Sequence, residues 1–421
     1  MLHRSRCRRP ARVVGAVVGA LAAVNVGFAP GAAAYDAQSK QWYLEPMQAE
    51  QMWKVSTGKG IKIALIDSGV NANTASLKGQ VLTDEVPKSV AYGATDDYMG
   101  HGTSMAELMA GTGAGGSLQG LAPGAKIVPY RIELDGLKGG AEELEKTPDA
   151  IDAIRAAADT DAQIISMSFG SVGPSSKEEE AIEYAASKGK LMIASVGNKG
   201  QNKGSIGYPA AYPYVVGIAA VDSSGTVPEF SSSGDYVDLT APGDGFPGWC
   251  DATFRSYCDD KSGTSPAVAI ASASAALIWS AHPDWTVNQV TRSLIDTASR
   301  TWAKDDPSKY AGYGMVRPRK VLEDLNYDAG SANVDPLSKE NGGDLLANSA
   351  STASPSPSPS PSPSTASQAP DGDSPDGTSA AGAATEASKD SNTLWIALGS
   401  AAAAIVIGGA GVAVMRARRA R

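Results

Sequence analysis

Between residues 60 and 300, short apolar segments alternate with amphipathic or small-residue segments. The apolar segments show little alternation of polar and apolar positions, which is typical of strands covered on both faces of a sheet. We predict strands at Lys62–Ile66, Lys126–Arg131, Ile164–Met167, Leu191–Ser195 and Val215–Val221. We predict helices at Thr103–Gly111, Asp149–Asp159, Ser176–Ser187, Ser265–Ala281 and Thr286–Thr297. This alternation favours an α/β fold with a mostly parallel central sheet flanked by helices.

The predicted helix that begins at Ser265 has small residues on every side, mainly alanine and serine. A helix without a polar face is typical of a buried position. We therefore expect it at the centre of the domain.

Both ends of the chain carry apolar segments beside arginines. Residues 1–34 combine five early arginines, the apolar run Val13–Phe28 and Ala32-Ala33-Ala34, which is the pattern of a secretory signal peptide. Residues 393–415 carry no charge and are long enough for one transmembrane helix. The basic tail at 416–421 predicts a cytoplasmic C-terminus. We expect a single-pass protein of the cell membrane whose main domain is extracellular.

The segments between these ends divide by composition. Residues 35–60 form a short N-terminal extension, and residues 61–328 hold the alternating pattern of the main domain. Residues 329–392 are rich in Ser, Pro, Ala, Gly and Asp, with a Ser-Pro repeat from 354 to 364. Such a composition cannot bury a core, so we predict a disordered linker between the domain and the membrane.

The whole chain has a formal net charge of −9. The predicted signal and tail contain only basic charges, so the part expected outside the cell is more acidic still. An acidic domain repels phosphate backbones, which argues against nucleic acid as a partner. The sequence predicts neither a cofactor nor a metal site.

Three residues far apart in the sequence could form a nucleophilic site. Asp67 ends an apolar strand, His101 lies in Gly-His-Gly-Thr, and Ser265 lies in Ser-Gly-Thr-Ser-Pro. His101 is the one well-placed histidine, because His3 lies in the predicted signal and His282 in an Ala-His-Pro helix end. A serine becomes a good nucleophile when a histidine takes its proton, and a carboxylate can orient that histidine. The chain order Asp, His, Ser is that of the subtilisin triad.

From about Trp42 to about Tyr327 the chain resembles the subtilisin-like serine proteases. The resemblance rests on four short segments in the family's order. They are Asp67-Ser68-Gly69, His101-Gly102-Thr103, Ser195-Val196-Gly197-Asn198 and Ser262-Gly263-Thr264-Ser265-Pro266. It implies a subtilisin-like three-layer fold and catalysis by Asp67, His101 and Ser265. It also implies that Asn198 donates a hydrogen bond to the oxyanion, with the backbone N–H of Ser265 as the second donor.

The same resemblance implies where a polypeptide substrate binds. The segment Ile165–Gly170 is similar to the family strand that pairs with an extended substrate, as in β-augmentation. The implied walls of the primary pocket are Ser168, Phe169 and Gly170 on one side and Ser195, Val196 and Gly197 on the other. Ser171 stands where the family often has a second glycine. For Phe169, an ordinary core position is the alternative reading.

Of three cysteines, Cys7 lies in the predicted signal, which leaves Cys250 and Cys258. In an oxidising compartment a disulfide is the expected state of such a pair. Two free thiols are the alternative. The loop offers no clear set of metal ligands.

The predicted architecture resembles that of the mycosins, membrane-anchored proteases of type VII secretion in actinobacteria. It consists of a short extension, a protease domain, a Pro-rich linker and one membrane span. The resemblance implies association with a secretion complex and limited cleavage of exported substrates. The extension is too short for an independent inhibitory domain, so we expect it to pack permanently on the enzyme. Two other functions stay open: a housekeeping protease of the cell wall, and a mainly structural scaffold of a membrane secretion complex.

Overall fold

The computed structural model describes residues 36–134, 136–200, 207–324 and 326–338. The signal, membrane-span and tail segments predicted at 1–34, 393–415 and 416–421 lie outside the described residues. Contacts divide the chain into residues 1–356 and 357–421, and every described residue belongs to the first unit.

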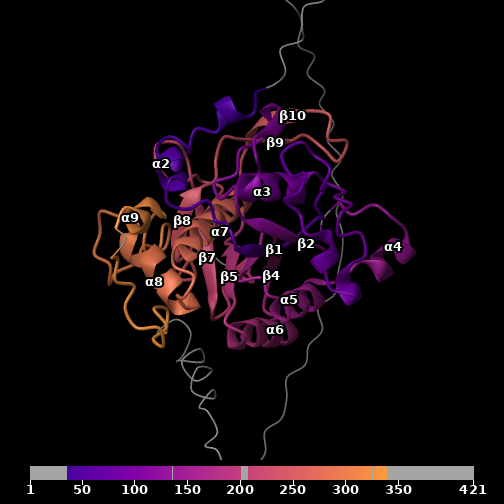
Figure 1. Ribbon diagram of the computed structural model, residues 1–421. Helices are drawn as coiled ribbons and strands as arrows, with labels where there is room; N and C mark the ends of the chain where they lie inside the picture. The colour runs from indigo at the N-terminus through magenta and orange to yellow at the C-terminus, as the bar shows by residue number, and fades with distance from the viewer. Residues whose placement is uncertain (1–35, 135, 201–206, 325, 339–421) are drawn as a thin grey trace, which may run out of the picture. The chain divides into compact units, whose positions relative to one another are not determined.

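A six-stranded sheet forms the centre of the described domain, and neighbouring strands are parallel throughout (Figure 1). Its order is β2-β1-β3-β5-β7-β8. The strands are β1 (Lys62–Asp67), β2 (Lys126–Arg131), β3 (Ile164–Met167), β5 (Leu191–Ser195), β7 (Val215–Val221) and β8 (Leu239–Pro242). Five of them agree with the predicted strands to within one residue. The sixth, β8, was not predicted from the sequence.

Helices cover both faces of the sheet, which gives three layers. Alternate residues of β1 point to opposite faces, as the pleat requires. Ile63 and Leu65 belong to a core shared with α3 (His101–Ala110) and α7 (Thr264–Ala281). Ala64 and Ile66 belong to a second core, shared with α5 (Ala150–Ala158) and α6 (Ser176–Ser187). The predicted α/β fold is confirmed.

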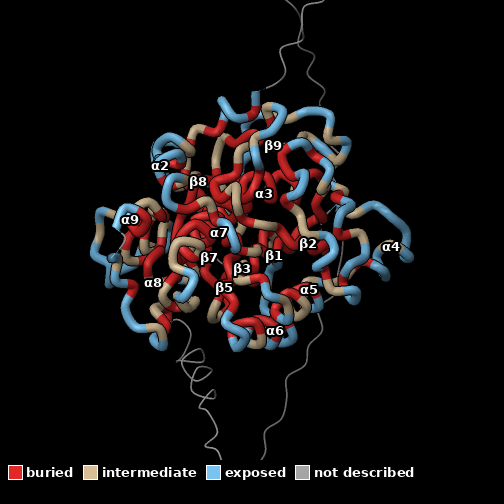
Figure 2. Tube along the Cα trace, viewed as in Figure 1, coloured by how far each residue is buried: buried red, intermediate tan, exposed pale blue. Residues whose placement is uncertain are grey.

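Helix α7 runs through the first of these cores and is buried from Thr264 to Trp279 (Figure 2). Among the described residues, it is the one helix long and apolar enough to cross a membrane, and 89% of that window is buried within the domain. It is therefore a core helix, as its small residues predict. The next helix, α8 (Val287–Thr297), packs against it.

Shorter elements lie around these layers. Two small antiparallel sheets accompany the main sheet. One is the hairpin of β9 (Phe246–Trp249) and β10 (Tyr257–Lys261), and the other pairs β4 (Ser171–Val172) with β6 (Gly207–Tyr208), which are far apart in the sequence. The short α-helices are α2 (Ala49–Trp53), α4 (Ala141–Lys146) and α9 (Arg319–Leu322). Single 3-10 turns occur at Gln38–Lys40, Thr83–Glu85, Lys88–Val90 and Ala114–Gly116.

The N-terminal extension lies on the domain through its aromatic residues. Tyr43 is fully buried, and the indole N–H of Trp42 donates to the carbonyl of Asp244 at 2.9 Å. The indole N–H of Trp53 donates to the carbonyl of Leu121 at 2.8 Å. The extension therefore shares the core that surrounds α3 and α7.

Packed chain continues past residue 328, where the sequence predicted the domain to end. The Arg292 guanidinium on α8 donates to the carbonyls of Ala329 and Ser331 at 3.0 and 2.8 Å. Leu337 is only 3% exposed and belongs to the main core. The beginning of the predicted linker, up to residue 338, is thus held by contacts that its polar composition does not reveal.

Candidate active site

Three predicted catalytic residues meet at the carboxyl end of the sheet, where ligands of open parallel sheets usually bind. Asp67 is the last residue of β1, His101 is the first of α3, and Ser265 is the second of α7. Gly100, with φ of 78°, makes the sharp turn into α3. A side chain there would also lie 2.8 Å from the carbonyl oxygen of Asp251, so glycine is required.

Asp67 is completely buried and orients the imidazole of His101. Its Oδ1 lies 2.7 Å from His101 Nδ1, and it also accepts from the backbone N–H of Ser68 at 2.7 Å. A carboxylate accepts, so Nδ1 carries the hydrogen and Nε2 is the basic nitrogen. The His101 side chain is 31% exposed, which leaves its other edge open to a substrate.

The pKa of His101 reflects two opposing effects. Burial lowers it, because a charged imidazolium loses solvation. The negative charge of Asp67 and its hydrogen bond raise it, with a further contribution from the charge of Asp97. The raising effects are larger together, so the pKa of His101 lies above its ordinary value of 6.5.

A second buried carboxylate, Asp97, shapes the loop before His101, and sequence reasoning missed it. It accepts from the backbone N–H groups of Gly100 and Thr103 at 2.8 and 2.9 Å. It also accepts from the hydroxyl of Ser68 at 2.7 Å, next to Asp67. Burial raises the pKa of Asp97, although these hydrogen bonds oppose the rise. Asp97 lies four residues before the start of α3 and six before the predicted start at Thr103, so no capping pattern marks it in the sequence.

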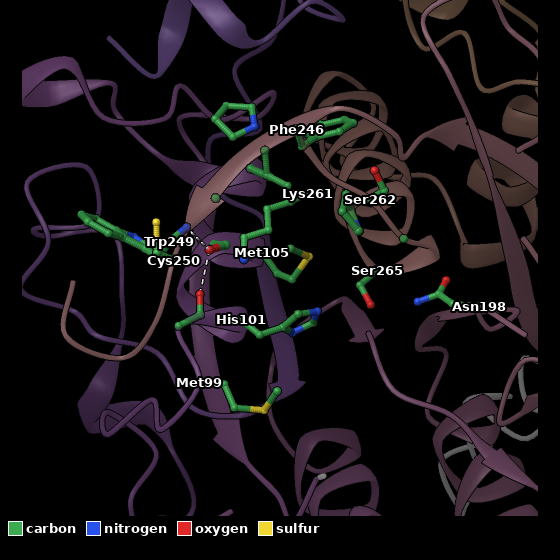
Figure 3. A pocket seen from close by; sticks show the side chains of 17 residues that line it. Met99, His101, Met105, Asn198, Phe246, Trp249, Cys250, Lys261, Ser262 and Ser265 are labelled. Carbon is green, nitrogen blue, oxygen red and sulfur yellow. Dashed lines mark hydrogen bonds between the residues drawn. The ribbon is translucent and has the colours of Figure 1, made fainter. Parts of the chain in front are cut away.

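Ser265 lies at the N-terminus of α7 and is 8% exposed. Its hydroxyl and the His101 ring face the same hollow from two different helices (Figure 3). In this structure the hydroxyl donates to the carbonyl of Ser168 at 3.3 Å, and the described residues show no bond to His101. Catalytic hydrogen bonds are often formed only in the substrate complex.

Asn198 follows β5 and has its amide oriented by Thr264. The side-chain oxygen of Asn198 accepts from the backbone N–H and the hydroxyl of Thr264, at 2.8 and 2.9 Å. With the oxygen engaged there, the amide nitrogen points toward Ser265 (Figure 3). A donor so placed can stabilise negative charge that develops beside the nucleophile.

Two hollows meet at Ser265. The smaller has a volume of about 170 Å³ and is lined by all six predicted substrate-binding residues: Ser168, Phe169, Gly170, Ser195, Val196 and Gly197. The larger, of about 380 Å³, is lined by His101 and by residues of the β9–β10 hairpin. Within the described ranges there is no group of three or more His, Cys, Asp and Glu side chains suited to a metal ion.

The β9–β10 hairpin is closed by the predicted disulfide between Cys250 and Cys258. Trp249 of this hairpin stacks on Tyr257, with ring centroids 4.0 Å apart and planes 25° apart. Cys250 and Trp249 line the larger hollow. The disulfide therefore braces one wall of the candidate site.

Glu107 is a buried acid on α3 that the sequence reading did not single out. It is 0% exposed and accepts from the hydroxyls of Thr74 and Tyr257, at 2.7 and 2.6 Å. Burial raises its pKa to about 7, against the lowering effect of these hydrogen bonds. Through Tyr257, Glu107 connects the helix that carries His101 to the hairpin. A lone acid inside the apolar run Met105–Ala110 was the available signal.

Comparison with known proteins agrees with this architecture. Residues 58–314 match the Subtilase family. The chain is 32% identical over 304 residues to minor extracellular protease Epr of Bacillus subtilis (strain 168), covering 70% of this chain but only 44% of that relative.

Solved structures give a second comparison. The crystal structure of MycP1 from Mycobacterium smegmatis is similar in fold to this chain, with a TM-score of 0.58 and 22% sequence identity. The match covers 72% of this chain and 88% of MycP1. The structure of the MycP3 protease from the type VII (ESX-3) secretion system matches with a TM-score of 0.57 and 26% sequence identity. This match covers 71% of this chain and 90% of MycP3. The chain belongs to the subtilase family and is a serine endopeptidase related to the mycosins.

Proposed function

We propose that this chain is a membrane-anchored extracytoplasmic endopeptidase that cleaves polypeptides through Asp67, His101 and Ser265. The observation that carries the proposal is the 2.7 Å contact between buried Asp67 and His101, whose ring faces the same hollow as Ser265. The motifs around these residues are those of the subtilisin-like proteases.

The proposed reaction has two halves. As the Ser265 oxygen bonds to the scissile carbonyl carbon, His101 Nε2 takes the hydroxyl proton and the carbonyl π electrons move to oxygen. Asn198 and the Ser265 backbone N–H stabilise that oxyanion. His101 then gives the proton to the leaving amine as the C–N bond breaks, which leaves an acyl-enzyme. A water oxygen then bonds to the acyl carbon while His101 takes its proton. The bond between this carbon and the Ser265 oxygen breaks, the acid product leaves, and His101 returns the proton to the serine.

The place of the enzyme in the cell rests on the sequence of the terminal segments. The signal pattern at 1–34 and the uncharged stretch at 393–415 support export with one C-terminal membrane anchor. The similarity to MycP3, a protease from the type VII (ESX-3) secretion system, supports a role beside such a system. In that setting the substrates are exported proteins cleaved at few sites.

The test is peptidase activity of the purified full-length protein against its Ser265→Ala variant. We expect turnover to fall by roughly 10⁶, because triad members act as a unit. Activity near the wild-type level in the variant would refute the assignment. A Ser265→Ala strain that still exports its proteins normally, while a deletion strain does not, would point to the scaffold function. Many small products in place of a few discrete ones would point to the housekeeping protease.

A further inference from the structure

We propose that the larger hollow beside His101 is a subsite for a bulky apolar side chain on the first residue after the scissile bond. This inference rests on the proposed function and adds the substrate class that the site selects. The predicted substrate-binding residues all line the smaller hollow, so the larger one has no assigned occupant.

The position of His101 decides which part of the substrate the larger hollow receives. His101 must give a proton to the leaving amine, so the chain that begins with this amine leaves along the His101 side. His101 lines the larger hollow and is absent from the lining of the smaller one, whereas Ser265 lines both. The smaller hollow therefore binds the part of the substrate before the scissile bond, which becomes the acyl group. The larger hollow binds the part after this bond, which leaves as the amine.

The lining of the larger hollow is mostly apolar at its base. Met105 and Leu108 of α3 and Phe246 of β9 are 4%, 1% and 1% exposed, and all three line it. Met99, which is exposed, and Trp249, which is partly exposed, also line it. An apolar side chain that enters removes its own surface and that of these residues from water.

Two polar side chains of the lining, Ser104 and Lys261, bear on which substrate side chains the hollow accepts. Ser104 donates its hydroxyl hydrogen to the carbonyl of Gly100 at 2.7 Å and accepts from the N–H of Trp249 at 2.9 Å. Lys261 is exposed at the rim, where it repels a basic side chain, as protonated His101 does. Its attraction for an acidic side chain is weak, because both charges would stay solvated. The volume of about 380 Å³, against about 170 Å³ on the acyl side, leaves room for Leu, Met or Phe.

The walls of this hollow are held from behind, so it is preformed. Phe246 stacks on buried Tyr43 of the N-terminal extension, with ring centroids 4.9 Å apart and planes 24° apart. The hairpin opposite is closed by the disulfide of Cys250 and Cys258. Because the pocket is preformed, little binding free energy is spent on ordering its side chains. Differences in shape between substrate side chains therefore appear as differences in the reaction rate.

Acyl transfer tests this subsite separately from the acyl side. Full-length enzyme is acylated with a small peptide ester, and amino-acid amides compete with water for the acyl-enzyme. By microscopic reversibility, the attacking amine binds where the leaving amine departs. We expect the amides of Leu and Phe to be captured at least about tenfold more efficiently than that of Gly, since each methylene in a fitting pocket changes selectivity by about 10-fold or more. Equal capture, or preferred capture of the Asp or Lys amide, would overturn the subsite.

A variant pair locates the preference within the hollow. Met105→Gln keeps the shape of the side chain but makes the base polar, and should lower the ratio of Leu to Gly capture severalfold. Leu144→Gln, a matched change on α4 outside both hollows, should leave this ratio unchanged. Each capture ratio compares two amines that react with the same acyl-enzyme. Because unfolded molecules form no acyl-enzyme, partial unfolding of a variant does not alter the ratio. An unchanged ratio in Met105→Gln would overturn the assignment. Failure of the ester to acylate Ser265 would instead refute the proposed function, and the subsite with it.

Discussion

Glu107→Gln is the substitution whose effect on stability follows most directly from the structure. Glu107 is fully buried and accepts hydrogen bonds from Thr74 and Tyr257. A glutamine keeps the size of the side chain. Its oxygen can accept from the Tyr257 hydroxyl, and its N–H can donate to the Thr74 hydroxyl. The substitution therefore removes the ionisation of the group while leaving its packing nearly unchanged.

The sign of the pH effect comes from the direction of the pKa shift. Burial raises the pKa of Glu107 from 4.5 to about 7, so the folded protein binds this proton more tightly than the unfolded chain. The resulting stability is fully present below about pH 4.5 and is lost as the pH rises through about 7. At about 1.4 kcal/mol per pKa unit, the loss is on the order of 3 kcal/mol.

Urea unfolding of the full-length protein between pH 5 and 8.5 measures this loss. The free energy of unfolding of Glu107→Gln minus that of wild type should rise by about 2–3 kcal/mol over this range. The difference cancels the titration of His101 and the other groups. The same change at exposed Glu45 is the matched control for removing a carboxylate from the surface. A flat difference for Glu107→Gln would refute the reasoning from burial.

Three further outcomes are expected of the full-length enzyme. Asn198→Ala should lower kcat by about 10² to 10³ with little change in KM, as measured with a fluorogenic peptide, because its donor acts on the transition state; an unchanged kcat would place the donor elsewhere. The acid limb of kcat/KM should titrate above pH 6.5, since neutral His101 is the base and its pKa is raised; a limb below 6.5 would contradict the effect of Asp67. A chain that lacks residues 35–58 should melt at a lower temperature and gain no activity, since Tyr43 is part of the core; higher activity at an unchanged melting temperature would indicate an inhibitory peptide.

The sequence predicts the parallel strands well because burial on both faces leaves an apolar run with clear ends. Strand β8 is buried as well, but its sequence Leu-Thr-Ala-Pro contains a threonine and a proline and forms no such apolar run. It has four residues, Leu239–Pro242, and lies at the edge of the sheet, where a proline is tolerated. Its pairing with β7 is a long-range contact that no local pattern encodes. The packing of residues 329–338 on α8 is likewise set by tertiary contacts of Arg292.

For the candidate site, short motifs identify the groups that would react but not those that hold them. Asp67, His101 and Ser265 carry recognisable neighbours in the sequence. Asp97 looks like an ordinary loop acid until the fold buries it, and only the apolar neighbours of Glu107 set that acid apart. The same holds for Phe246, whose place at the base of the larger hollow depends on Tyr43, about 200 residues earlier.

Covalent labelling with a serine-directed fluorophosphonate tests the proposed triad most directly. Peptide mapping of the labelled full-length protein should place one adduct on Ser265. Labelling of His101→Ala should be slower by several orders of magnitude, because the base that activates the hydroxyl is gone. An adduct on another residue, or labelling of His101→Ala at the wild-type rate, would contradict catalysis by Asp67, His101 and Ser265.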